Sequence, residues 1–221
     1  MKSLSSISLL AFDENEAESL SEWARGLDWV HWLMESVRHR VTSITFDSAP
    51  TGKSRSLISV AWDAYAEKTL HEVMAPVLIR AWKAARDGDV DELLRCDVEL
   101  GKKLPATAST SSVEAGHWLL RTTRGARYQG VLGKYRMAVE ERGLETHCAV
   151  VWAVTGWFFQ LGLANVIAEY LHLEWEIATR HLGDRQGPVG RYSIAGLTSR
   201  MVHSEAAESG LRAAGPADVR A

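Results

Sequence analysis

Apolar residues recur at helical spacing along most of this chain. The most regular stretch runs from Thr69 to Arg121 and carries three apolar stripes with a period near 3.6 residues. Each stripe follows a pair with capping-box spacing, in which Thr, Asp or Ser precedes Glu by three positions. These pairs are Thr69–Glu72, Asp89–Glu92 and Ser111–Glu114. The pattern predicts three successive helices that start at the pairs, with Gly88 between the first two.

Further apolar stripes lie on both sides of this stretch. They predict helices over 21–37, 56–68, 128–142, 148–182 (two helices broken near Gly162) and 193–209. Leu57 and Val60 are expected to face the core, and Pro76 is expected to kink the helix that begins at Thr69. We therefore expect an all-α fold, a single-domain bundle of roughly eight to ten helices over residues 1–210. Residues 211–221 are expected to form a disordered tail.

One segment has the length of a membrane span. Residues 148–168 contain no charged side chain over 21 positions, which is enough to cross a bilayer. The segment also contains Thr155, Gln160 and Asn165, and a turn-like Leu-Gly-Leu at 161–163. Two buried helices explain this composition better than a span does. A membrane-associated helical protein is the alternative.

The charge balance, the N-terminal residues and the two cysteines reduce the number of protein classes to consider. With 25 basic and 28 acidic residues the net charge is −3, so a basic surface for nucleic acid is not expected. Residues 1–19 lack the long apolar region and cleavage site of a signal peptide. Cys96 and Cys148 lie on apolar helix faces and are expected to be buried, reduced thiols. These features together indicate a cytoplasmic protein.

The sequence contains no recognisable active-site or metal motif. Its eight histidines form no HExxH pair, and its two cysteines no CxxC pair. We interpret His147–Cys148 as an ordinary helix start, and Glu174 and Glu176 as solvated helix positions. The prediction is a protein that is not an enzyme and binds no cofactor stably. The alternative is a small-ligand-binding protein or enzyme, in which some of the nine tryptophans line a pocket.

Small and apolar residues in the central stretch follow a recognisable order. A helix ending in A-x-x-A-A leads to a G-D turn, then to L-x-x-x-D-x-x-L and to S-x-x-x-G-x-x-L-L. The residues are Ala81, Ala84, Ala85, Gly88, Asp89, Asp97, Leu100, Ser112, Gly116, Leu119 and Leu120. This order resembles the UreF family of urease accessory proteins.

Other parts of the chain carry further elements of the family pattern. Gly26-Leu27-Asp28-Trp29 follows a leucine pair near the N-terminus, and His147 precedes an L-G-L break and a Tyr-Leu pair. Arg185, Pro188 and Gly190 match a segment near the C-terminus. The chain departs from the pattern at four points. Thr107-Ala108-Ser109 stands in place of an E-L-R triplet, and Gln186 and Gly187 replace an apolar pair. A P-x-G-G-[FY]-S-x-S segment is missing before Gly26, and Arg191 stands where the family has Gln.

The resemblance implies a protein that works by contact. UreF proteins are all-helical and non-catalytic, form dimers, bind the accessory protein UreD (also called UreH) and recruit the GTPase UreG. The assembly delivers nickel to apo-urease, so nickel is the transferred ion and not a resident cofactor. Neither nucleic acid nor a membrane is an implied partner.

The resemblance also implies where partners bind. It places Gly26, Leu27, Asp28, Trp29, Arg185, Pro188, Gly190 and Arg191 on or beside partner-facing surfaces. Arg185 matches a basic position implicated in productive activation, either by contacting the GTPase or by gating it. An equally open interpretation is that Arg185 is a helix-end cation near free carbonyl groups.

Overall fold

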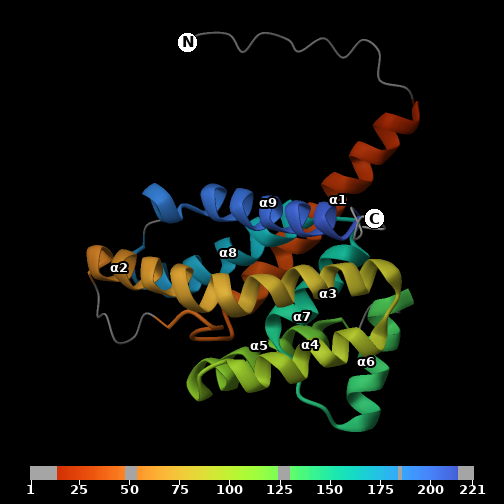
Figure 1. The fold of residues 1–221 in the computed structure, drawn as a ribbon, viewed down its shortest axis with the longest axis horizontal. Coiled ribbons are helices and arrows are strands. Elements are labelled where there is room, and N and C mark those ends of the chain that lie inside the picture. Colours follow the sequence, from red (N-terminus) through yellow and green to blue (C-terminus); the bar gives the residue numbers. More distant parts are fainter. Residues whose placement is uncertain (1–13, 48–53, 124–129, 184–185, 214–221) are drawn as a thin grey trace, which may run out of the picture.

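The structure, a computed structural model, describes residues 14–47, 54–123, 130–183 and 186–213, with side chains between 25 and 204. These ranges form helices and turns, and no strand occurs within them (Figure 1). The predicted all-α bundle is confirmed. Residues 211–213 of the predicted tail are helical, and 214–221 lie outside the described residues.

Nine α-helices occur within the described ranges, in agreement with the expected number. They are α1 (Glu14–Arg38), α2 (Arg55–Tyr65), α3 (Ala75–Asp87), α4 (Val90–Lys103), α5 (Ala106–Thr122), α6 (Gly130–Arg142), α7 (Cys148–Phe158), α8 (Leu163–Thr179) and α9 (Ile194–Ala213). A π-helical segment, η2 (Ala66–Met74), joins α2 to α3. Short 3₁₀ turns follow at η3 (Arg180–Leu182) and η4 (Gly190–Tyr192).

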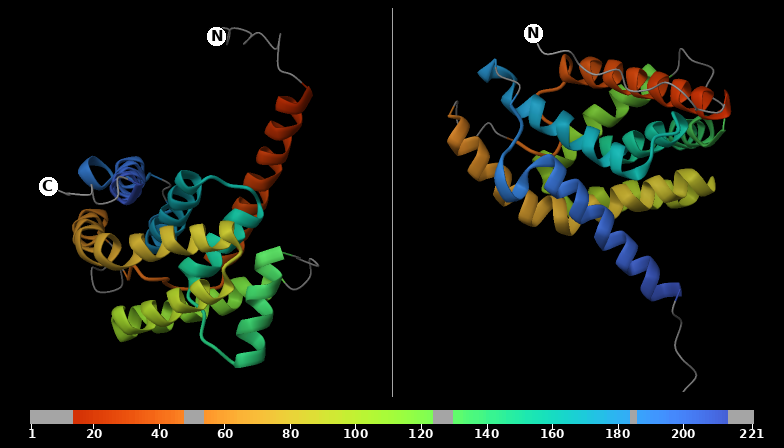
Figure 2. Two further views of the ribbon diagram at one scale, coloured as in Figure 1. Left: turned by 45° about the vertical axis from the view of Figure 1, so that its right-hand side comes forward. Right: turned by 90° about the horizontal axis from the view of Figure 1, so that it is seen from above.

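Helix α7 lies at the centre of the bundle. Its main neighbours are α3 and α5, and every residue from Cys148 to Gly156 is buried. Figure 2 shows α8 between α1 and α9, both of which it contacts. The uncharged stretch 148–168 is therefore explained by two packed helices, and no helix in the described part of the chain is long and apolar enough to cross a membrane.

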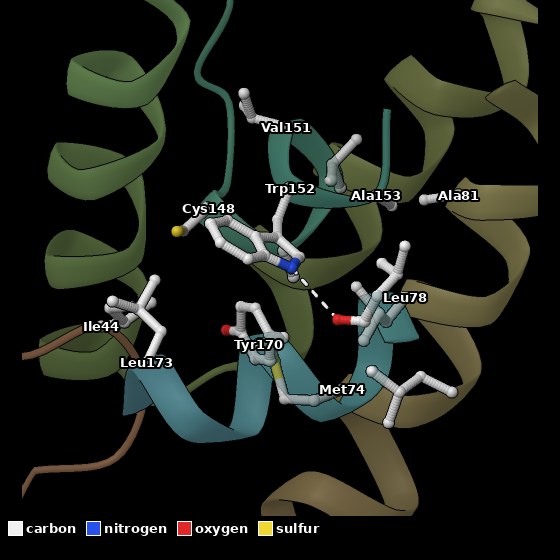
Figure 3. Packing of buried hydrophobic residues seen from close by; sticks show 14 of the residues in the cluster. Ile44, Met74, Leu78, Ala81, Cys148, Val151, Trp152, Ala153, Tyr170 and Leu173 are labelled. Atoms are coloured by element: carbon white, nitrogen blue, oxygen red, sulfur yellow. Dashed lines mark hydrogen bonds between the residues drawn. The ribbon is translucent and has the colours of Figure 1, made fainter. Parts of the chain in front are cut away.

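The core between α7, α8 and α3 is built around Trp152. Its indole N–H donates to the carbonyl oxygen of Val166 on α8 at 3.1 Å, so burial of the ring leaves no polar atom unpaired (Figure 3). Tyr170 packs beside it with ring centroids 6.5 Å apart. The two cysteines, Cys96 and Cys148, are buried and free, as predicted.

The start of α7 is buried, so its amide groups need partners inside the protein. The backbone N–H of His147 donates to Asp97 of α4 at 2.7 Å. The backbone N–H of Cys148 donates to the hydroxyl of Ser112 on α5 at 3.3 Å. Two side chains from different helices thus satisfy the first donors of α7.

Gly116 allows α5 to approach the same segment. A Cβ atom at this position would lie 2.2 Å from the carbonyl oxygen of Thr146 and 2.8 Å from the carbonyl carbon of His147. Both are backbone atoms, which cannot rotate away. Only glycine fits there, which explains its place four residues after Ser112.

Two of the three predicted helix starts are wrong. Asp89 does cap α4, because its carboxylate accepts the Glu92 amide at 2.9 Å, and Gly88 ends α3 with a φ of 76°. Thr69, however, lies inside the continuous helical segment 55–87, and Ser111 lies inside α5. A Ser or Thr three residues before Glu is thus not sufficient to begin a helix when the apolar stripe continues on its N-terminal side.

The π-helical segment follows from an unusual spacing of buried residues. From α2 into α3, every fourth side chain is buried: Ile58, Trp62, Ala66, Leu70, Met74 and Leu78. In an α-helix, residues four positions apart are offset by about 40° around the helix axis, so a row with this spacing turns gradually away from the core. A π-helix has more residues per turn and offsets this drift. Pro76 follows the π-helical turns directly, at the start of α3.

The prediction that Leu57 and Val60 face the core is wrong. Their exposed fractions are 54% and 67%, whereas Ile58 and Trp62 are fully buried. Apolar residues occur on two faces of α2, and the face that carries the larger Trp62 side chain is the one that packs.

We predict that Gly116→Ala destabilises the protein by about 3 kcal/mol, the upper end of the range for overpacking, because the added methyl group meets fixed backbone. Gly101→Ala on α4 is the matched control. Its Cβ would meet only the His147 ring at 3.5 Å, and the substitution gains up to about 1 kcal/mol of helix propensity. Urea unfolding followed by tryptophan fluorescence measures both. Equal stability of the two variants would contradict the close approach described above.

Candidate partner-binding surface

A buried carboxylate, Glu174 on α8, fixes the segment between α1 and α2. It accepts the backbone N–H groups of Thr45 and Phe46 at 3.0–3.2 Å and the hydroxyl of Tyr170 at 2.8 Å. Glu174 is 1% exposed, so the prediction of a solvated position is wrong. Burial raises the pKa of this carboxyl group, and the hydrogen bonds from Thr45, Phe46 and Tyr170 lower it.

Glu174 falls on the apolar stripe of its own helix. It lies four residues after Tyr170 and three before Ile177, both of which are buried. This position was the sequence signal for an inward carboxylate. The groups that donate hydrogen bonds to the Glu174 carboxylate all belong to the protein. Glu174 therefore serves to hold residues 41–47 against α8.

Asp97 is the second buried carboxylate. Besides the His147 amide, it accepts the hydroxyl of Tyr135, which also bonds to Thr146. Burial raises the pKa of Asp97 to about 7, although the hydrogen bonds from His147, Tyr135 and Thr146 lower it. Burial lowers the pKa of the neighbouring His147 ring to about 4. Both groups are enclosed within the fold.

Of the predicted partner-binding residues on α1, two are exposed and two pack inward. Gly26 is buried against the α7–α8 turn, where a Cβ would lie 2.5 Å from the carbonyl oxygen of Phe159. Leu27 is half-buried against the core. Asp28 and Trp29 face outward, so the exposed part of this segment is smaller than predicted.

Trp29 belongs to an aromatic surface formed by the exposed Trp29 and Trp32 and the partly buried Phe159. The Trp29 and Phe159 rings are stacked, with centroids 6.0 Å apart and planes at 9°. Trp32 meets Trp29 edge-to-face at 5.5 Å. The exposed fractions of the two tryptophans are 47% and 53%, which is high for such large apolar side chains. Solvated aromatic residues on a fixed helix are typical anchors of protein interfaces.

The second predicted region, the 186–191 loop, is held by two buried tryptophans. The Trp175 indole donates to the carbonyl oxygen of Gln186 at 2.9 Å, and the Trp62 indole donates to that of Tyr192 at 2.9 Å. Between them, Pro188 is buried while Gly190 and Arg191 are exposed. Arg185 lies outside the described residues.

The structure does not bring the two regions together. Gly26 and Trp29 contact Phe159, just before α8 begins, whereas the 186–191 loop is held by Trp175, near the end of α8. Helix α8 has 17 residues and is therefore about 25 Å long. The chain thus offers two separate surfaces.

The concave sites on the described part of the protein are lined by a mixture of charged and apolar side chains. A groove of about 640 Å³ between α4 and α6 is lined by Asp91, Leu94, Arg95, Val98, Glu99, Lys102, Arg142 and Leu144. None of these is aromatic, so the groove is not the aromatic-lined ligand pocket considered above. Within the described ranges, no three His, Cys, Asp or Glu side chains are grouped so that they could hold a metal ion.

The chain was compared with models of known protein families. A family model, UreF, matches residues 61–176, which is more than half of the chain. The chain belongs to the UreF family. It is therefore a urease accessory protein, as the order of its central residues predicted. No curated protein sequence matches the chain.

The UreF match covers the residues that build the start of α7. Asp97, Ser112, Gly116 and His147 all lie within 61–176. Their place in the family pattern thus has a structural explanation, because they let three elements meet in the core. The match does not extend to Gly26–Trp29 or to the 186–191 loop. The assignment of these UreF-like segments to partner binding remains a prediction.

We predict a pH dependence of stability that Asp97 causes. Its pKa rises from 3.8 to about 7 on folding, so between these values the folded state holds a proton that the unfolded chain has lost. The contribution of Asp97 to stability therefore falls as pH rises from about 4 to about 7, by up to about 1.4 kcal/mol per pH unit. His147, whose pKa is lowered on folding, contributes in the opposite direction, so the Asp97 contribution is measured as the difference between wild type and a variant.

Asp97→Asn removes this titration and keeps an acceptor for the His147 amide. Over the same pH range its unfolding free energy should rise relative to that of the wild type. Asp91→Asn, which removes an exposed carboxylate from the same helix, is the control. Urea titrations at several pH values measure the difference. Parallel pH profiles for wild type and Asp97→Asn would refute the assignment.

Proposed function

We propose that this chain acts as a scaffold in urease activation. In this role it binds a UreD/UreH-type accessory protein and a UreG-type GTPase, and the assembly inserts nickel into apo-urease in a GTP-dependent step. Nickel is the cargo of this reaction. We further propose that the chain works as a homodimer in the cytoplasm and catalyses no reaction itself. UreF family membership supports this role.

The aromatic surface is the observation that carries the proposal. Trp29 and Trp32 offer large apolar area on α1, and their mutual contact and the stacking on Phe159 limit their freedom before a partner arrives. Little side-chain entropy is then lost on binding, so more of the contact energy appears as affinity. Asp97, His147 and Glu174 are buried, so these three groups are not accessible to a substrate.

The separation of the two surfaces supports a scaffold role. A protein that joins two partners must present two sites that do not overlap. The aromatic surface and the 186–191 loop lie near opposite ends of α8 and fulfil this requirement. We assign the aromatic surface to one accessory partner and the loop, with Arg185, to a second.

We predict that Trp29→Ala and Trp32→Ala each weaken binding of a UreD/UreH-type or UreG-type protein by at least about thirtyfold, as for a hot-spot residue. Co-purification of the tagged chain with each accessory protein, followed by titration, measures the loss. Met137→Ala on α6 is the matched control, because Met137 is also large, apolar and about half exposed.

The expected pattern is loss of one partner, retention of the other, and wild-type behaviour of the Met137 variant. Circular dichroism confirms that the variants are folded. If neither accessory protein binds the folded wild-type chain, the scaffold function is wrong. If both bind all three variants equally, the function stands but the aromatic surface is not its site.

A further inference from the structure

A small basic pocket lies between the π-helical segment and the last helix. It has a volume of about 130 Å³ and is lined by Ala66, Glu67, Leu70, His71, Arg191, Tyr192, Leu197, Arg200 and Met201. Its walls are η2 and, much later in the sequence, the adjacent elements η4 and α9. The volume is below the range of roughly 300–1,000 Å³ that is usual for sites of drug-sized ligands. The pocket therefore suits a single functional group.

Two arginines of the pocket are held against one tyrosine. The guanidinium carbons of Arg191 and Arg200 lie 5.3 Å and 5.1 Å from the centre of the Tyr192 ring. Cation–π contacts of this kind fix the planar groups while leaving their N–H donors available. Within the described part of the chain, neither arginine is paired with a carboxylate.

Tyr192 itself is held in place from both ends. Its hydroxyl donates to Glu67 of η2 at 2.7 Å, and its carbonyl oxygen accepts the Trp62 indole at 2.9 Å. The ring that orients both arginines is thus attached to the core of the bundle. The donors are arranged before any ligand arrives.

The balance of charge indicates the ligand. With His71 counted as neutral, Arg191 and Arg200 contribute two positive charges and Glu67 contributes one negative charge. One positive charge remains, which a single carboxylate neutralises. A phosphate dianion would bring one charge too many and would be repelled by Glu67.

We propose that this pocket binds a carboxylate side chain from an acidic segment of a protein partner. Arg191 and Arg200 donate charge-assisted hydrogen bonds to the carboxylate. Val189, which is 81% exposed and lies two residues before Arg191, offers an apolar contact next to the pocket. The inference rests on the proposed scaffold function for the existence of the partner, but the chemistry of the pocket is independent of it.

The test uses three probes on the full-length chain: a capped tetraglutamate peptide, its tetraglutamine analogue and inorganic phosphate. Binding is followed through the side-chain N–H signals of Arg191 and Arg200 in NMR spectra. Tetraglutamate should shift both signals, and Arg191→Gln or Arg200→Gln should weaken it about tenfold. Arg121→Gln, an equal change of charge on α5, should leave the affinity unchanged.

A second variant tests the balance of charge. Glu67→Gln removes the negative charge and keeps a polar partner for the Tyr192 hydroxyl. The pocket then carries two positive charges, so phosphate should bind and the preference for tetraglutamate should shrink.

Three results would overturn the proposal. They are equal binding of tetraglutamate and tetraglutamine, stronger binding of phosphate than of tetraglutamate to the wild type, or an unchanged preference in Glu67→Gln. Because the peptides require no urease component, a failed co-purification with accessory proteins would leave this result intact. A failed peptide titration would likewise leave the scaffold function untouched.

Discussion

The buried start of α7 is the constraint on which the rest of the bundle depends. A helix N-terminus has amide donors without helical partners, and leaving one unpaired inside a protein costs about 1–3 kcal/mol. Asp97 and Ser112 satisfy the donors at His147 and Cys148, and Gly116 lets α5 come close enough for this to happen. The three residues come from α4 and α5 and precede the first residue of α7 by 32 to 51 positions. With these contacts in place, α7 has a fixed position, and α3 and α8 pack against it.

Most helices could be predicted from apolar spacing, because burial of one face is what makes each of them stable. The predictions failed where the same local sequence pattern occurs in two different structural contexts. Thr69 and Ser111 stand three residues before a glutamate, but that spacing is also common inside helices, and the stripes continue past both. Glu174 was predicted to be solvated because of its charge, although its position three residues before Ile177 indicated the core. The partners of Asp97 and Glu174 could not be predicted, because they come from distant segments that only the tertiary fold brings near.

The predicted partner-binding residues illustrate the same limit. A shared sequence pattern does not distinguish a residue that packs from one that binds. Gly26 and Pro188 are buried and shape their segments, whereas Trp29 and Arg191 are exposed and can meet another molecule. The role of Arg191 depends on Tyr192 and Arg200, and the pocket they form includes side chains of η2 that no local pattern connects with them. Such surfaces are formed by residues that only the tertiary fold brings together.

The π-helical segment has a consequence for how the length of this chain can change. Tyr65, just before the segment, reaches the Glu174 network, while Ala81, beyond it, is buried in the core near α7. In an α-helix, deleting one residue between them would rotate one end of the helix relative to the other by about 100°. A π-helical segment holds more residues per turn than an α-helix, so a deletion here can instead be taken up by a return to α-helical geometry. A change of one residue in length should therefore be tolerated better between residues 66 and 74 than elsewhere between Tyr65 and Ala81.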